Sequence, residues 1–173
     1  MNKNKIHRQK KTMRNKVNPN EALNVEYTCF DCFSKLILET EDCNWNDVYL
    51  DEALFFLDRF TEDDWQQLLK YYHGWTNEQK SKMLESLLPE YPYHWKIIDD
   101  MIFTEDTDLF RRVAGHMCSI VLASPFPEDT VIDFIDKSMR LLPEQNFFWQ
   151  TIFRYAIENW GKKLSGQYNN PPD

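Results

Sequence analysis

The stretch FTEDDWQQLLKYYHGWTNEQKSKML, residues 60–84, shows the pattern that decides the fold. Its central apolar residues follow the i, i+3, i+4, i+7 spacing of one helix face: Trp65, Leu68, Leu69 and Tyr72. Thr61 and Thr76 stand where two helices would begin, and a threonine hydroxyl at such a position accepts a backbone N–H as an N-cap. Thr76 with Gln79 fits a capping box, and Phe60 is placed to pack on Trp65 as a hydrophobic staple.

The same spacing recurs along most of the chain, in apolar stripes that begin at Phe30, Leu50, Met83, Trp95, Leu109, Val131 and Phe148. A short motif also recurs, in which an apolar residue is followed by Thr or Pro and then by acidic or amide residues. Its Thr or Pro lies at positions 61, 76, 104, 127 and 143. This predicts an all-α fold of about eight helices joined by short turns. The Thr61–Thr104 interval is near the ~40–47 residues of HEAT units, so both an irregular antiparallel bundle and a short HEAT-like array fit.

Charge divides the 173-residue chain into parts. Residues 1–16 contain seven Lys or Arg and no acid, and we expect residues 1–20 to be a basic disordered tail. Such a tail either contacts nucleic acid or anionic lipid, or is simply solvated. Residues 21–161 are expected to form a single all-α domain, and residues 162–173 a loose C-terminal tail.

Acidity is the main functional signal of the predicted domain. The net charge of −8 includes the basic first residues; residues 17–173 hold 13 basic against 28 acidic residues. A surface of this kind attracts basic protein partners and repels nucleic acid and membrane phosphates. Its alternative role is to keep the protein in solution.

Cysteine usage and hydropathy predict a cytoplasmic protein with reduced thiols. No window approaches the ~18 apolar residues of a membrane span, and no apolar stretch follows the basic N-terminus. Cys29 and Cys32 have the spacing of a zinc-binding pair, but a structural zinc site needs four ligands. Because both cysteines lie within a helical apolar stripe, we interpret them as small buried hydrophobes and predict no metal.

Catalytic groups and cofactors are not predicted. Cys118 lies two residues from His116, which directs the two side chains to different faces of a helix, although His94 could approach Cys118 in the fold. His73, His94 and His116 belong to no recognised local motif, and we expect them to serve packing or surface roles.

Clusters of acids at helix starts provide the candidate partner-binding residues. Capping and helix-dipole effects explain acids in a first turn. Helix starts that line up along one edge would also build a negative ridge, which nearby aromatic side chains would complete as anchors. The predicted partner-binding residues are Glu62, Asp63, Asp64, Asp99, Asp100, Glu105, Asp106, Asp108, Tyr71 and Trp45.

These features resemble the small α-helical immunity proteins of bacterial contact-dependent inhibition and related polymorphic toxin systems. The resemblance covers residues 25–161 and rests on size, helical acidic character, aromatic richness and the Phe-Thr-Glu-Asp and Phe-Pro-Glu-Asp openings. It implies a cytoplasmic, non-enzymatic protein that neutralises one cognate basic toxin domain, commonly a nuclease. The alternatives are a helical adaptor that binds a peptide while its basic tail touches nucleic acid, and an enzyme with an acidic site.

Overall fold

The computed structural model describes residues 27–41, 45–123 and 125–167 and contains eight α-helices within them. They are α1 (Cys29–Glu39), α2 (Leu50–Leu57), α3 (Glu62–Tyr71), α4 (Asn77–Ser86), α5 (His94–Ile102), α6 (Thr107–Ser119), α7 (Glu128–Leu141) and α8 (Phe147–Leu164). Short turns of other helix types lie at Trp45–Tyr49, Tyr72–Gly74 and Leu142–Glu144. Since the described residues include no strand, the predicted all-α class is confirmed.

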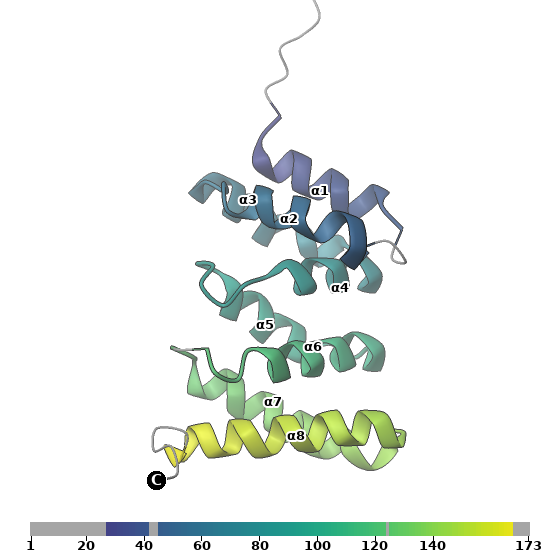
Figure 1. Ribbon diagram of the computed structural model, residues 1–173, viewed down its shortest axis with the longest axis vertical. Coiled ribbons are helices and arrows are strands. Elements are labelled where there is room, and N and C mark those ends of the chain that lie inside the picture. The colour runs from purple at the N-terminus through teal and green to yellow at the C-terminus, as the bar shows by residue number, and fades with distance from the viewer. Residues whose placement is uncertain (1–26, 42–44, 124, 168–173) are drawn as a thin grey trace, which may run out of the picture.

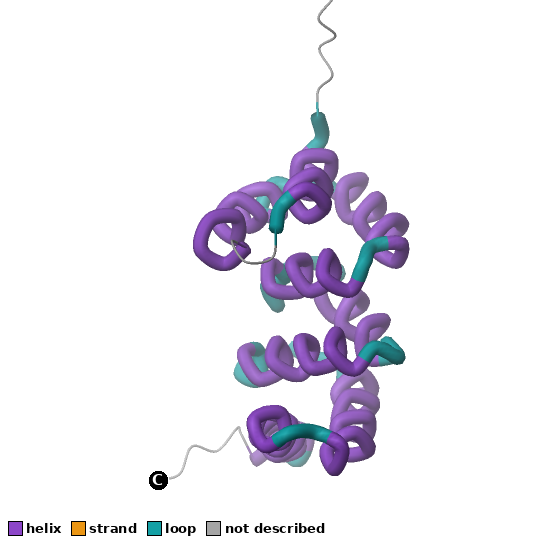
Figure 2. The backbone as a smooth tube through the Cα atoms, turned by 90° about the vertical axis from the view of Figure 1, so that its right-hand side faces the viewer, coloured by secondary structure: helices purple, strands orange, loops and turns teal. Residues whose placement is uncertain are grey.

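The helices stack as a short array of pairs. Helices α1, α2 and α3 lie together at the top of the molecule, α4 lies below them, and the pairs α5–α6 and α7–α8 follow further down (Figure 1). Seen from the side, α3, α5 and α7 form one column and α4, α6 and α8 the other (Figure 2). Helix α6 packs on both α4 and α8, and α5 packs on α7, so each pair buries its apolar stripes against its neighbours. This is the HEAT-like alternative of the two predicted arrangements.

Local sequence fixes the starts of the helices. Thr28, Thr61 and Thr76 cap α1, α3 and α4, and each forms a full capping box with the third residue of its helix. The predicted staple is present, since the rings of Phe60 and Trp65 meet edge to face with centroids 5.0 Å apart. These contacts pair backbone N–H groups that would otherwise lack partners at a helix start.

Two predictions about boundaries need correction. Thr104 does not open a helix: Asp106 is the N-cap of α6, and the Thr104 hydroxyl accepts a bond from the Asp106 N–H. Thr61 therefore opens the first helix of one pair and Asp106 the second helix of the next, so the Thr61–Thr104 interval is not the repeat length. The expected tail from residue 162 is wrong for its first residues, because α8 continues to Leu164. The predicted tail at 1–20 lies outside the described residues.

Three lysines each tie one helix to the C-terminal end of another that is not its neighbour in the chain. Lys82 of α4 donates to the Thr40 carbonyl at the end of α1, at 2.5 Å. Lys137 of α7 donates to the carbonyls of Ile102 and Thr104 at the end of α5. Lys163 of α8 donates to those of Val121 and Ala123 beyond α6. We call these residues the lysine clamps. Each places a cation at the negative end of a helix dipole and pairs carbonyls that the helix leaves unbonded.

Replacing a clamp should therefore weaken the fold. The side chain of Lys82 is 2% exposed, and its ammonium also lies 3.3 Å from Glu78. In Lys82→Met the methylene volume is kept while the charged hydrogen bond is lost, so we expect the free energy of unfolding to fall by about 2 kcal/mol. Urea unfolding followed by circular dichroism measures this, with the exposed Lys96→Met as control. Equal stability of the two variants would contradict a clamping role.

Candidate protein-binding surface

The two layers of the array carry opposite charge. Helices α3, α5 and α7 hold nine acidic and four basic residues, whereas α4, α6 and α8 hold four acidic and seven basic residues. We call the first set the acidic layer and the second the basic layer. Because the first helix of each pair falls in the same column, acids that are distant in sequence gather on one side of the molecule.

The first turn of α3 divides the predicted residues into surface and buried groups. Glu62 and Asp63 are exposed. Hydrogen bonds from Tyr93 and Gln66 hold the pKa of Glu62 below its usual range, which keeps it ionised. Asp64, in contrast, is 3% exposed, so its prediction as a partner-binding residue is wrong. A side chain at this depth cannot reach a partner without unfolding its surroundings.

Asp64 instead joins α1 to α3. One carboxylate oxygen accepts the N–H of Phe30 at 3.1 Å, and the other accepts the N–H and hydroxyl of Thr61. Burial opposes its ionisation, but these hydrogen bonds prevail and lower its pKa. The carboxylate is thus a permanent acceptor inside the fold.

The two predicted aromatic anchors differ in exposure. Tyr71 is half exposed at the end of α3 and stacks on Phe30. Trp45 is 1% exposed and belongs to the core, which contradicts its prediction as a contact for a partner.

Asp99 and Asp100 hold the acidic layer together as well as charging it. Asp99 accepts a hydrogen bond from Thr130 of α7 at 2.9 Å, and Asp100 accepts one from the Tyr72 hydroxyl. His73 lies 3.9 Å from the Asp100 carboxylate. Burial, and then the neighbouring Asp100, raises the pKa of Tyr72, so its hydroxyl remains a donor. Asp100 stays exposed on this side of the array.

The remaining predicted acids fall in two places. Glu105 is exposed in the turn after α5, and Asp106 caps α6 by accepting the Leu109 N–H at 2.7 Å. Asp108 begins the exposed side of α6, where it pairs with Arg111. Asp108 therefore belongs to the basic layer, unlike Glu62, Asp63, Asp99 and Asp100.

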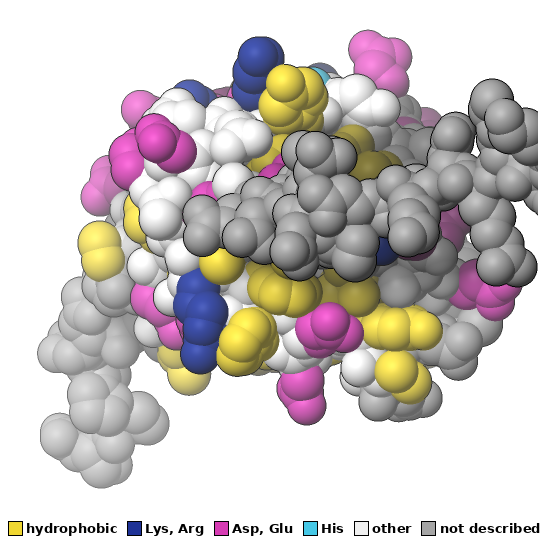
Figure 3. All heavy atoms as spheres, turned by 90° about the horizontal axis from the view of Figure 1, so that it is seen from above, with side chains coloured by type: hydrophobic (Ala, Val, Ile, Leu, Met, Phe, Trp, Pro, Cys, Tyr) yellow, Lys and Arg dark blue, Asp and Glu magenta, His cyan; other side chains and the backbone are white. Residues whose placement is uncertain are grey.

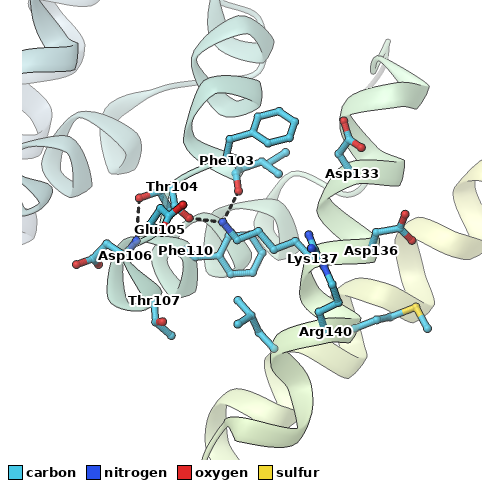
Figure 4. A pocket seen from close by; sticks show the side chains of 13 residues that line it. Phe103, Thr104, Glu105, Asp106, Thr107, Phe110, Asp133, Asp136, Lys137 and Arg140 are labelled. Atoms are coloured by element: carbon cyan, nitrogen blue, oxygen red, sulfur yellow. Dashed lines mark hydrogen bonds between the residues drawn. The ribbon is translucent and has the colours of Figure 1, made fainter.

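A pocket of about 830 Å³ opens between the end of α5, the start of α6 and α7 (Figure 4). We call it the α5–α7 pocket. Its apolar lining is Ile102, Phe103, Phe110, Met139 and Leu141, and its charged lining is Glu105, Asp106, Asp133, Asp136, Lys137 and Arg140. Asp133 and Asp136 project from α7 on one side, and Asp106 and Thr107 lie on the opposite side. The pocket thus combines an apolar floor with carboxylates on two walls.

Sequence reasoning missed four residues of this pocket as candidate binding residues. Asp133 and Asp136 were visible as acids three positions apart, on the α7 face opposite the apolar stripe. Phe103 and Met139 gave no such signal: Phe103 follows the last turn of α5, and the spacing placed Met139 in the core stripe of α7. In the structure Phe103 is 62% and Met139 57% exposed.

A second group of exposed apolar side chains lies at the end of the array formed by α1–α3: Tyr27, Leu38, Val48, Phe55 and Tyr71. Viewed from above, hydrophobic side chains lie among acidic ones on the visible part of this end (Figure 3). These residues are spread over several elements, whereas Phe103 and Met139 line a single pocket.

His94 and His116 form a pair, and Cys118 is a thiol that stays protonated. His94 approaches His116 and not Cys118: the two Nε2 atoms are 2.9 Å apart. Burial lowers the pKa of His94 to about 4, and burial together with His94 lowers that of His116 to about 3. Burial raises the pKa of Cys118 to about 11, and its thiol donates to the Ile152 carbonyl. A thiol in this state is a poor nucleophile at neutral pH.

Cys29 and Cys32 lie half-buried on α1 with free thiols. Within the part of the chain that the structure describes, no three His, Cys, Asp or Glu side chains gather as a metal site would require. In that same part, no helix has the length and apolar character needed to cross a membrane. Comparisons with family models, curated proteins and solved structures gave no match to this chain.

Proposed function

We propose that this chain is a non-catalytic binding protein whose acidic layer holds a basic protein partner. The separation of charge between the two layers carries the proposal, because a charge added only for solubility has no reason to collect on one side. Glu62, Asp63, Asp100, Asp133 and Asp136 are exposed on the acidic layer, where a partner's Lys and Arg side chains would meet them. Such a field accelerates encounter and selects partners of opposite charge.

The specific function we propose is that of a cytoplasmic immunity or inhibitor protein for a basic toxin domain, in particular a nuclease. Nuclease surfaces are basic because they bind phosphates, and an acidic protein can occupy or cover them. The resemblance in size, helical content and acidity to immunity proteins supports this choice. The free thiols of Cys29, Cys32 and Cys118 fit a reducing compartment.

The alternative is an adaptor that binds a peptide, and such an adaptor would also use the α5–α7 pocket. This pocket has the size of a recognition site and lies open between two helix pairs. The adaptor would use the basic residues 1–16, which lie outside the described residues, to contact nucleic acid. Deleting residues 1–16 distinguishes the functions, since only the adaptor should lose salt-sensitive nucleic-acid binding.

Affinity capture from native host lysate, followed by mass spectrometry, is the first test. One basic protein recovered in equimolar amount would support the inhibitor function and would then be assayed for nuclease activity with and without this chain. An active partner that this chain leaves uninhibited would contradict the inhibitor function.

Reversing charge on the acidic layer should weaken the captured complex. We expect Asp133→Lys combined with Asp136→Lys to lower the affinity for the basic partner at least about tenfold, mainly through slower association. The matched control is Asp108→Lys with Glu158→Lys, which makes the same charge change in the basic layer. Surface plasmon resonance at two salt concentrations measures both. Equal losses in the two variants would contradict recognition by the acidic layer.

A further inference from the structure

We propose that the α5–α7 pocket is the anchor point of the partner interface and receives a large apolar side chain flanked by lysine or arginine. This inference rests on the proposed function, and it names what the acidic layer recognises beyond net charge. The occupant is a segment of the basic partner protein.

Exposed apolar side chains at the pocket mouth are the first observation. Phe103 follows the end of α5, and Met139 lies on the outward face of α7. Both are more than half exposed, yet both line the same hollow, whose floor includes the fully buried Phe110. Large apolar side chains that face one pocket are a feature of protein-interaction sites, because a partner removes them from water. Methionine suits this role since its flexible thioether adapts to the shape of an incoming group.

The charges around this apolar centre are arranged asymmetrically. Glu105 lies on the α5–α6 side, and Asp133 and Asp136 lie on α7, all of them exposed. The ammonium of Lys137 donates to the carbonyls of Ile102 and Thr104, and its charge also acts on Glu105, so Asp133 and Asp136 are the carboxylates that it leaves to a partner. Carboxylates on two walls therefore face an entering segment, with Arg140 on the rim as the opposing charge.

Lys137 also completes the floor of the pocket. Its Nζ lies 4.7 Å from the centroid of the Phe110 ring, and burial lowers its pKa. The lysine side chain then covers the ring while its ammonium donates hydrogen bonds to two backbone carbonyls. An apolar side chain entering between Phe103 and Met139 would meet hydrocarbon at the base and carboxylates at either side.

These features select one class of occupant. Nucleic acid would bring phosphates against Glu105, Asp133 and Asp136, which is repulsive. A purely basic segment would leave Phe103 and Met139 in water, and a purely apolar one would leave the carboxylates unpaired. A segment with an apolar residue between basic residues satisfies both, and the volume of about 830 Å³ is ample for one large side chain with its flanking backbone.

Two labelled peptides test the proposal with the full-length protein. One places a leucine between two short runs of lysine and arginine, and the other has glycine in place of the leucine. Fluorescence anisotropy at low ionic strength gives both affinities. We expect the leucine peptide to bind about tenfold more tightly, the effect of burying one such side chain. This preference should vanish in Phe103→Ser with Met139→Ser and persist in Phe148→Ser, an equally exposed phenylalanine of the basic layer.

The outcomes separate this inference from the proposed function. Equal, salt-sensitive binding of the two peptides would overturn the anchor pocket while leaving recognition by the acidic layer intact. Binding of neither peptide would overturn the anchor pocket, whereas the proposed function is overturned only if the captured basic partner binds equally well after charge reversal on the acidic layer. If the leucine peptide bound only after removal of residues 1–16, that segment of the chain would be the occupant, and the partner version would be wrong. Concentration-dependent dimerisation that disappears in the Phe103→Ser, Met139→Ser variant would identify a second copy of this chain as the occupant of the pocket. That result would also overturn the proposal that a partner protein occupies it.

Discussion

The Asp64→Ala variant is expected to unfold with a free energy about 3 kcal/mol smaller than that of the native protein. Its carboxylate accepts the N–H of Phe30 and both the N–H and hydroxyl of Thr61, in a position with almost no access to water. Alanine removes an N-cap interaction of α3 and leaves the N–H of Phe30 buried without a partner, and each loss is worth 1–2 kcal/mol or so.

The matched control is Asp63→Ala, one position earlier in the same turn and exposed. It should stay within about 0.5 kcal/mol of the native protein. Urea unfolding at neutral pH measures both. Equal stability of the two variants would show that Asp64 does not join α1 to α3. The comparison also matters for binding studies, because a loss of partner binding in an Asp64 variant would report unfolding and not a lost contact.

Acidification from pH 7 to pH 5 is expected to remove about 3 kcal/mol of stability through His94 and His116. Their pKa values in the folded protein, about 4 and about 3, lie below the unfolded value of 6.5. Between these values the unfolded chain binds more protons than the folded one, so stability falls as pH falls. Burial is the main cause of both lowered pKa values, and the pairing adds to it for His116, because one Nε2 donates to the other at 2.9 Å and an added proton would set two donors against each other.

The surroundings of the pair offer an added proton little compensation. His94 is fully buried beside the edge of Trp95, and its Nδ1 has no hydrogen-bond partner. His116 borders a hollow that also contains Glu85 and Arg112, which are paired with each other at 3.2 Å. Asp64 does not contribute in this range, because its lowered pKa makes its own contribution disappear only below about pH 4.

Urea unfolding at pH 7 and pH 5 tests the histidine prediction. The double variant His94→Gln, His116→Gln should be less stable at pH 7 but should lose most of the pH dependence. His73→Gln, at an exposed position, should retain it. If the double variant kept the native slope, other groups would be responsible for it.

The helix starts could be predicted because capping is local. The caps at Thr61 and Thr76 and the Phe60–Trp65 staple each join two residues no more than five positions apart. All three formed as expected. The use of Asp64 could not be predicted, since its third partner, Phe30, lies 34 residues away. Periodicity could not reveal that Met139 is exposed, because a stripe indicates a helix face but not how far the neighbouring helices cover it.

The acidic clusters in the sequence likewise predicted a negative surface, but not which of the acids lie on the same side of the array. The sequence indicates acids at many helix starts, and only the alternation of layers shows which of them share a side. Asp99 and Asp100 fall in the acidic layer, whereas Asp108 falls in the basic one, although eight residues or so separate them in the chain. The α5–α7 pocket needs three elements to meet, so no local pattern specifies it.

The lysine clamps bear on the cooperativity of unfolding. In a stack of helix pairs most contacts join neighbours, so an end pair can open while the rest stays folded, and the strength of the junctions decides whether the chain melts in one step. Lys82, Lys137 and Lys163 each place a charged hydrogen bond across such a junction. They reinforce coupling between units more than the stability of any single helix. Lys137 and Lys163 span the same junction, between the α5–α6 and α7–α8 pairs, whereas Lys82 is the single clamp between α4 and α1. Loss of Lys82 would then weaken the coupling at its junction, so that hydrogen exchange on the two sides proceeds at separate rates.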